Sequence, residues 1–379
     1  MRTDLCEMFG IEYPIFAFTP SEHVAAAVSR AGGLGVLGAV RFNEPEELDT
    51  ALTWLDENTD GRPYGVDVVM PMKIPTEGKA LDLKAMIPEE HISFVQRTLQ
   101  QLGVPPLPDE EGVGREGVLG WLHSVARSHV DIALNHRPVL IANALGSPPV
   151  DVIEQAHANG VKVAALAGAA KHALSHVNNG VDVIVAQGYE AGGHTGEIAS
   201  MVLIPEVVDA VGPDVPVLGA GGVGSGRQIA AALALGAQGV WTGSMWLTVA
   251  EYDLSTGTGI RDALLRAGSG DTVRTRVYTG KPARLLKTRW TEAWEAEDAP
   301  SPLPMPLQNL LVANAHNRMN SGDDPDTISM PAGQIVGRLN EVRPVADVVA
   351  DLVREFDEAV GRMEKARVTH DVTAPHPVR

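Results

Sequence analysis

Short runs of consecutive apolar residues alternate with segments of helical periodicity over the first 245 residues of the chain. The runs are apolar throughout, which is typical of parallel strands that are covered on both faces of a sheet. Most of the helical segments end in Gly or Asn-Gly, the usual signal for the end of a helix. The pattern predicts eight strands, at 13–18, 35–38, 64–70, 139–145, 162–168, 181–188, 215–221 and 239–244.

Eight strand–helix units favour an α/β fold of the TIM (β/α)8 barrel type over a doubly wound open sheet, the alternative. A polar, Pro-rich insertion at 71–136 follows the third strand, at the end of the barrel where active sites are built, so we expect a lid or wall. An inert insertion or a subunit contact is the other interpretation of this segment. Strand signals fade after residue 245, and we expect a barrel over 1–290 with a C-terminal helical extension, 291–379, packed on it.

Charge and cysteine content narrow the class of protein. The 379 residues include 30 Lys and Arg against 48 Asp and Glu, a formal net charge of −18, which argues against nucleic-acid and anionic-membrane partners. The single cysteine, Cys6, excludes an internal disulfide and a multi-cysteine metal site. No apolar run reaches the roughly 18 residues of a membrane span. We therefore expect a cytoplasmic protein.

Two glycine motifs raise the question of a nucleotide site. GAGGVG at 219–224 matches G-x-G-x-x-G, but no Asp or Glu follows between Asp214 and Glu251 to bind a ribose. GLGVLG at 33–38 matches the same pattern while entering a strand, where it can hold no pyrophosphate. In a barrel, the loops after strands 7 and 8 often bind phosphate through amides and hydroxyls. The residues at these places are Gly221, Gly222, the helix start at Ser225, Thr242, Gly243 and Ser244; simple tight turns are the alternative.

Histidine is the main candidate for chemistry. His194 lies in AQGYEAGGHTGE, 186–197, directly after the sixth strand and so at the catalytic end of a barrel. With an unperturbed pKa of about 6.5, it could act as a base or as a hydrogen-bond donor, and position alone leaves a structural role open. His172 and His176 share a helical face without a third ligand, so we expect solvated side chains and no metal site. The sequence contains neither a G-x-S-x-G elbow nor a Walker A motif.

Four segments, 25–38, 186–196, 215–237 and 239–247, resemble the nitronate monooxygenase (2-nitropropane dioxygenase) family. That family also contains flavin-dependent enoyl-acyl-carrier-protein reductases and NADH:quinone reductases. The resemblance covers about residues 1–290, and its most specific part is the combination of EAGGH with AGG. It implies a TIM barrel with non-covalent FMN, whose phosphate is held by the loops after strands 7 and 8.

The resemblance also assigns residues. His194 matches the active-site histidine, a base in nitroalkane oxidation and a polar contact in the reductases. The flavin-contacting positions are matched by Phe18, Thr19, Asp67, Gln187, Gly192 and Gly193, and the phosphate cradle by Gly221, Gly222, Gly243 and Ser244. The first-strand loop, FAFTPSEH, lacks the usual Gln-Ala-Pro-Met-Ala segment. Asp67 stands where the family usually has Asn, and a carboxylate there could accept a hydrogen bond but not donate one.

Two enzymatic reactions follow from the resemblance. In the first, an alkyl nitronate is oxidised with O2 to a carbonyl compound and nitrite, with no external reductant. In the second, NAD(P)H reduces the flavin, which passes hydride to an enoyl or acyl thioester or to a quinone. A flavin-carrying barrel without activity is the non-enzymatic alternative. We expect small-molecule substrates, no nucleic-acid or membrane partner, and a homodimer as one assembly.

Overall fold

The computed structural model describes residues 1–70, 83–106, 123–254 and 257–367. Its centre is a closed barrel of parallel strands in the order β1-β2-β3-β4-β5-β6-β8-β9. The expected TIM barrel is therefore confirmed, and every predicted strand is present. The barrel strands are β1 (Ile15–Thr19), β2 (Leu34–Gly38), β3 (Tyr64–Val68), β4 (Leu140–Asn143), β5 (Lys162–Ala167), β6 (Val183–Gln187), β8 (Val217–Ala220) and β9 (Gly239–Thr242).

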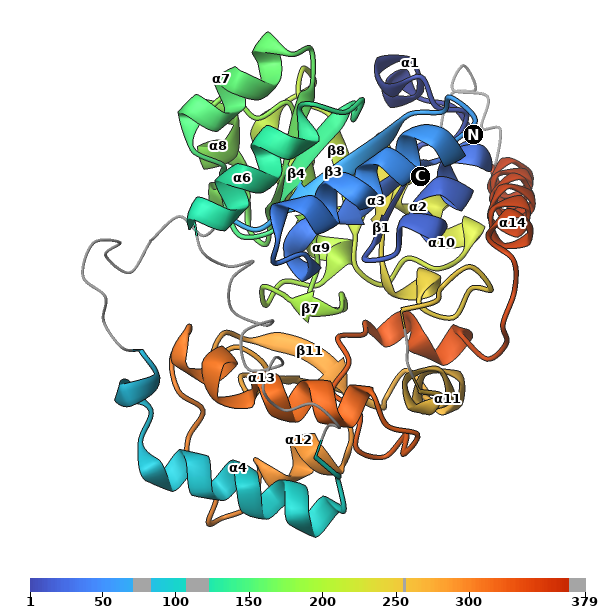
Figure 1. Cartoon of the computed structure of the whole chain (residues 1–379). Coiled ribbons are helices and arrows are strands. Elements are labelled where there is room, and N and C mark those ends of the chain that lie inside the picture. The colour runs from blue at the N-terminus through green and yellow to red at the C-terminus, as the bar shows by residue number, and fades with distance from the viewer. Residues whose placement is uncertain (71–82, 107–122, 255–256, 368–379) are drawn as a thin grey trace, which may run out of the picture.

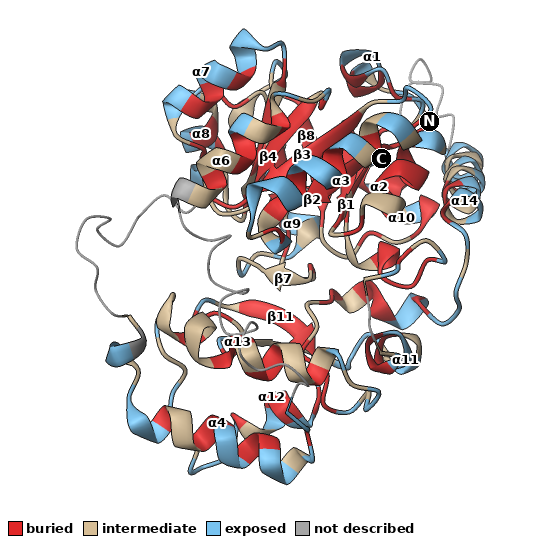
Figure 2. Ribbon diagram, in the orientation of Figure 1, coloured by how far each residue is buried: buried red, intermediate tan, exposed pale blue. Residues whose placement is uncertain are grey.

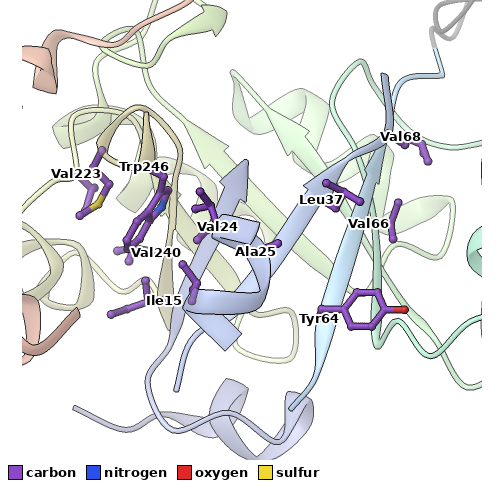
Figure 3. Packing of buried hydrophobic residues seen from close by; sticks show 14 of the residues in the cluster. Ile15, Val24, Ala25, Leu37, Tyr64, Val66, Val68, Val223, Val240 and Trp246 are labelled. Carbon is purple, nitrogen blue, oxygen red and sulfur yellow. The ribbon is translucent and has the colours of Figure 1, made fainter. Parts of the chain in front are cut away.

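Alternate residues of each barrel strand face opposite sides, so the apolar runs build two cores. One core lies between the strands and the surrounding helices, and includes Leu37, Val66 and Val68 (Figure 3). The other fills the barrel lumen with residues such as Val36 and Leu140. The short helix α1 (Asp4–Phe9) closes one end of the lumen, because its apolar side chains, including that of Cys6, belong to the lumen core.

A ring of helices surrounds the strands (Figure 1). Its members are α2 (Glu22–Arg30), α3 (Pro45–Asn58), α6 (His123–Ala133), α7 (Val150–Ala158), α8 (Ala170–Asn178), α9 (Ser200–Val211), α10 (Gly226–Ala234) and α14 (Val345–Ala366). Helix α14 packs on both α10 and α2, so it fills the place between the last strand, β9, and the first, β1. Val345, Val349 and Leu352 of α14 are buried in the core between strands and helices. The barrel is thus completed by a helix from the C-terminal part of the chain.

The remaining elements include a second lobe, which we define as α4 (Glu89–Leu102), β10 (Thr272–Thr275), β11 (Ala283–Leu286), α12 (Arg289–Ala293) and α13 (Leu307–Asn320). Helix α4 packs on α12 and α13, and buried residues lie on these helices (Figure 2). They form a core of their own, in which the Phe94 and Trp294 rings meet edge to face with centroids 4.8 Å apart. Shorter elements are β7 (Gly193–His194), α11 (Gly259–Arg266), η1 (Ala39–Arg41), η2 (Lys84–Met86), η4 (Ser244–Trp246) and η5 (Gln334–Arg338).

The described parts of the segment expected as an insertion, 71–136, lie in two different places in the structure. Helix α4 lies in the second lobe, whereas α6 packs on α3 and β3 as an ordinary barrel helix. Residues 71–82 and 107–122 lie outside the described residues, so the lid stays a prediction. The expected division at residue 290 also stays a prediction, although β10 and β11 lie before it in the second lobe and α14 lies after it on the barrel. No helix in the described part of the chain is long and apolar enough to cross a membrane.

Candidate active site

Three of the expected site residues point into the lumen at the carboxyl ends of their strands. Phe18 on β1, Asp67 on β3 and Gln187 on β6 each directly follow a residue of the core between strands and helices. Because side chains alternate along a strand, all three face the opposite side, which is the lumen. Phe18 also stacks on Trp241 of β9, with ring centroids 6.4 Å apart.

Two other expected residues hold the loops together instead. Thr19 is 1 % exposed, and its Oγ1 accepts a hydrogen bond from the Ser21 N–H at 3.1 Å. Thr242 Oγ1 donates to the Phe16 carbonyl at 3.0 Å and accepts from Trp246 Nε1–H at 2.9 Å. Both side chains therefore have partners within the protein, and the flavin contacts expected for Thr19 and Thr242 stay predictions.

The loops after β8 and β9 present a group of backbone donors, which we call the amide cradle: the N–H groups of Gly222, Val223, Gly243 and Ser244. Among the described residues, none of these four amides has a hydrogen-bond acceptor. A Cβ added to Gly222 would lie 3.5 Å from Glu190 Cβ, and one added to Gly243 would lie 3.8 Å from Phe18 Cδ1, so neither position is crowded. Gly221 and Gly222 have positive φ, as amide groups that converge on an anion commonly require. The amide cradle has the chemistry of a phosphate site.

The start of helix α10 does not take part in the amide cradle, contrary to expectation. The Gly226 N–H donates to Glu355 Oε2 of α14 at 2.9 Å. The Gly224 N–H and the Ser225 hydroxyl both donate to Gln228 Oε1, at 3.0 Å and 2.9 Å. Since a carboxylate already caps this helix, a second anion would be repelled there.

His194 is held in a strand. Gly193 and His194 form β7, which pairs antiparallel with β11 so that His194 lies opposite Ala283 and Gly193 opposite Arg284. Because β11 also pairs with β10, the loop after β6 is the third strand of a small sheet shared with the second lobe. The position of the histidine is therefore set by two lobes at once.

Glycine is required at the two positions before His194 for different reasons. A Cβ on Gly192 would come within 2.7 Å of the Gly333 nitrogen and 2.8 Å of the Ala332 carbonyl carbon, so close packing against the chain requires glycine there. Gly193 has φ +73 with nothing within 4 Å of its missing Cβ, so its requirement is conformational. Close approach to a flavin was expected for both residues and stays a prediction.

A buried hydroxyl orients the histidine. Thr279 is fully buried, and its Oγ1 lies 2.7 Å from His194 Nε2. The same Oγ1 accepts the backbone N–H of Lys281 at 3.3 Å, which fixes the hydroxyl in turn. Burial, and then the positive charge of Lys281, lower the pKa of His194 to about 4. The imidazole is thus neutral near pH 7 and can accept a proton.

Two arginines secure the chain on either side of β7. Arg284 is 2 % exposed, donates to the Tyr189 carbonyl from Nε and Nη2 at 3.2 Å and 3.0 Å, and lies over the Tyr189 ring at 4.4 Å. Arg274 donates to the Thr195 carbonyl at 3.1 Å. These residues and Thr279 were missed in the sequence, although 272–289 holds six Lys and Arg with no acid in a chain of net charge −18. That local reversal of charge was the available signal.

The chain around Gly333 joins the two halves of the site. Gly333 N–H donates to Ser244 Oγ at 2.8 Å, next to the amide cradle, and Gln334 N–H donates to the Glu190 carbonyl at 2.9 Å, in the loop that carries His194. Ser244 keeps its hydroxyl proton for a further acceptor. One short segment thereby fixes the cradle relative to the histidine.

Asp67 differs from its expected chemistry. Its side chain is 2 % exposed, and burial raises its pKa well above the usual value for a carboxyl group. A protonated carboxyl group donates a hydrogen bond, as the amide of Asn does. Burial therefore favours the protonated form of Asp67 over the carboxylate that was expected to accept only, and the flavin contact itself stays a prediction.

The histidine pair on α8 is also not as expected. His176 is 2 % exposed, and its Nε2 lies 3.1 Å from the Leu166 carbonyl, so it is a buried structural residue, whereas His172 is exposed. Within the described ranges, no group of three or more His, Cys, Asp or Glu residues could hold a metal ion.

Comparison with known proteins identifies the family of the chain. The profile of the family described as "Nitronate monooxygenase" matches residues 2–355. The chain belongs to the nitronate monooxygenase family. Like its relatives, it is an oxidoreductase with a TIM barrel, and the family match extends past the expected boundary at residue 290 to include the first half of α14.

Relatives of this nitronate monooxygenase family member match over nearly their whole length. "Putative monooxygenase Rv1533" of Mycobacterium tuberculosis is 49% identical, covering 96% of this chain and 99% of the relative. "Probable nitronate monooxygenase" of Staphylococcus aureus (strain Newman) is 28% identical, covering 94% and 98%. Among solved structures, nitroalkane oxidase from Streptomyces ansochromogenes has a TM-score of 0.78 at 26% identity, covering 95% and 99%. FabK from Thermotoga maritima has a TM-score of 0.73 at 26% identity, covering 97% and 100%.

Proposed function

We propose that this protein is an FMN-dependent nitronate monooxygenase of the cytoplasm, which oxidises alkyl nitronates with O2 to a carbonyl compound and nitrite. The observation that carries the proposal is a neutral, strand-held His194 tied by one short segment to the amide cradle. The similarity to a nitroalkane oxidase over 95% of this chain supports the same reaction class.

The residues present fit FMN. Four unbonded amides and the Ser244 hydroxyl suit a phosphate, and lumen-facing Phe18, Asp67 and Gln187 offer an apolar surface with two polar groups for a flat ring. Bound FMN would supply the electron acceptor for the substrate and the group that reduces O2. Gly222 and Gly243 leave room for the phosphate because they lack Cβ atoms.

His194 gives the site its acid–base chemistry. With a neutral nitroalkane, its imidazole would take the proton from the carbon beside the nitro group. With a nitronate, which is already deprotonated, the ring would orient the substrate by a hydrogen bond. Thr279 keeps the ring in one orientation for either task, because it binds Nε2 and is itself held by the Lys281 amide.

The reductase reaction remains the second candidate, because FabK matches the chain with a TM-score of 0.73. In that case, NAD(P)H would be the reductant and an enoyl or acyl thioester, or a quinone, the acceptor. The two reactions differ in whether a pyridine nucleotide is consumed.

Anaerobic mixing separates the two functions. The yellow protein is mixed with propionate 3-nitronate, and separately with NADH and with NADPH, while the flavin absorbance is followed. We expect bleaching by the nitronate and none by the pyridine nucleotides, and nitrite should accumulate once air is admitted. Bleaching by NADH or NADPH alone would instead identify a reductase. Chromatography of the heat-released flavin distinguishes FMN from FAD.

His194→Ala is the matched variant for this assay. It should retain FMN, because the amide cradle lies on other loops, and it should lose activity most strongly with neutral nitroalkanes. A variant that purifies without flavin would show that His194 has a binding role in place of the proposed one.

A further inference from the structure

Asp67 is a carboxyl group placed inside a barrel. Its strand neighbours Val66 and Val68 belong to the core between strands and helices. The Cβ that Gly65 lacks would lie 3.2 Å from Leu140 Cβ and 3.4 Å from Val36 Cγ2, both of which belong to the lumen core. Gly65 and Asp67 therefore face the lumen, and Asp67 lies one layer closer to the end where the loops gather.

Among the described strand residues, the neighbours of Asp67 carry no charge. Its register partners, Gly38 on β2 and Ala142 on β4, are apolar. The other lumen-facing side chains at this level of the described barrel strands, Phe18, Leu166 and Gln187, do not titrate. Within the described parts of the chain, Asp67 forms no ion pair and no side-chain hydrogen bond. An ionised carboxylate there would be buried without compensation, which is strongly unfavourable.

A partner-less buried acid at the mouth of the lumen is suited to a ligand that accepts a hydrogen bond. The amide cradle opens at the same end of the barrel, on β8 and β9. A flavin whose phosphate lies in the cradle carries carbonyl and ring-nitrogen acceptors on its isoalloxazine ring. The only lumen-facing donors at this level among the described strand residues are Asp67 and Gln187.

We propose that Asp67 is a neutral carboxylic acid in the resting protein and that it donates its proton in a hydrogen bond to the isoalloxazine ring. This inference rests on the proposed FMN site and specifies the protonation state of Asp67 within it. Asp67 thus provides the donor that an amide would provide, but with a proton that can be lost. Raising the pH far enough to ionise Asp67 would replace the donor with a negative charge and weaken binding of the flavin.

Infrared spectroscopy tests the proton directly. At pH 7, the wild-type apoprotein should show the carbonyl stretch of a protonated carboxylic acid that is missing in Asp67→Asn, and addition of FMN should shift that band to lower frequency. If no acid band disappears in Asp67→Asn, or if FMN leaves the band unmoved, the proposal is wrong.

Flavin affinity provides the second test. At pH 6, Asp67→Asn should bind FMN within about threefold of wild type, because the amide also donates, whereas Asp67→Leu should bind about three- to tenfold more weakly, the usual effect of one lost hydrogen bond. The ratio of the wild-type Kd to the Asp67→Asn Kd should not decrease between pH 6 and 10, because ionisation of Asp67 can only weaken binding by the wild type. Titration of the FMN phosphate and ring affects both proteins equally and cancels in this ratio. Equal binding by Asp67→Leu would overturn the inference.

These measurements do not depend on turnover. If the nitronate reaction is absent but the acid band shifts on FMN binding, the reaction is wrong and the role of Asp67 stands. If nitrite is produced but the band is absent, the opposite conclusion holds. Circular dichroism of all three proteins establishes that the variants are folded.

Discussion

At the residue scale, the pairing of His194 with Thr279 brings together two side chains that are 85 positions apart. Neither residue alone indicates a catalytic role. An exposed histidine would titrate near its ordinary pKa of about 6.5, and the hydroxyl of a buried threonine usually forms a structural hydrogen bond and nothing more. Together they give an oriented, neutral imidazole. The properties of the site therefore arise from the contact and not from either residue type.

Thr279→Val should lower kcat by about tenfold to a hundredfold while leaving the FMN content unchanged, because an orienting partner is lost without a change in volume. Thr279→Ser should restore most of the rate, since it returns the hydroxyl. Steady-state kinetics together with flavin absorbance measure both effects. A Thr279→Val enzyme of normal activity would show that the contact is only structural.

The pH profile with a neutral nitroalkane should be flat through neutrality and fall only near pH 4, since burial and Lys281 lower the pKa of His194 to about 4. Lys281→Met removes the positive charge and should raise that pKa, so that activity begins to fall at a higher pH. Lys287→Met, which removes a lysine 3.8 Å from Glu292, is the control and should leave the profile in place. Identical profiles for wild type and Lys281→Met would contradict the assignment of this charge.

Gly222→Asp should abolish retention of FMN, because it places a carboxylate at the amide cradle. Gly61→Asp is a matched control: its φ of +73 equals that of Gly222, +71, to within a few degrees, and both sites have room for a Cβ. Both variants thus carry the same backbone strain, and only Gly222→Asp adds charge to the site. Flavin absorbance after gel filtration gives the result, and full flavination of Gly222→Asp would refute the cradle.

At the scale of elements, the pairing of β7 with β11 makes the active-site loop part of the second lobe's sheet. The segment around Gly333 strengthens this junction, because its backbone packs against Gly192 with no space for a side chain. Disturbing the junction should therefore move the histidine without touching either ligand-binding loop.

Gly192→Ala tests the junction. The added Cβ would lie under 3 Å from backbone atoms of Ala332 and Gly333, which cannot move aside as a flexible side chain can. We expect a lower melting temperature, by several degrees, and a kcat at least tenfold below wild type. Gly193→Ala is the comparison, since its Cβ meets nothing and only backbone strain of about 1 kcal/mol arises. Equal melting temperatures for the two variants would show that close packing at Gly192 is unimportant.

The sequence was sufficient for the barrel because each strand is a continuous apolar run, and a run such as VDVIVAQG at 181–188 needs no partner to be recognised. The second lobe could not be found in this way. Strands β10 and β11 have only four residues each and contain arginine, and α4 reaches its partner α13 across some 200 positions. Likewise, a glycine in sequence does not reveal that Gly192 packs against Ala332, because nothing local encodes a distant neighbour.

At the scale of the whole molecule, four histidines that are buried or half-buried have lowered pKa values in the folded structure: His129, His176, His194 and His316. Burial is the leading cause for each, with the pKa of His194 reaching about 4 and that of His316 about 3. In the unfolded chain, all four bind protons below about pH 6.5. The unfolded state thus binds more protons than the folded state between about pH 6.5 and 4.

The contribution of these histidines to the free energy of unfolding should therefore have its full value above about pH 6.5. It should fall as the pH is lowered toward 4, by up to about 1.4 kcal/mol per pH unit for each histidine. Asp67, with its raised pKa, acts in the opposite direction but is a single group. Urea titrations at pH 7 and pH 5 measure the difference. His316→Leu should reduce it, because this substitution removes one of the four groups. The same pH dependence in His316→Leu and wild type would count against burial as the cause.

Helix α14 has a consequence for how the protein is made. The ribosome completes the last barrel strand, β9, at residue 242, but the helix that covers the gap between β9 and β1 ends at residue 366. During synthesis, the apolar side of that gap stays uncovered while more than a hundred further residues are added. We expect the nascent barrel to become resistant to protease only once α14 has been synthesised and can pack on it, which pulse-labelling with limited proteolysis would detect. A chain stopped before α14 would then be a substrate for chaperones and not a smaller enzyme.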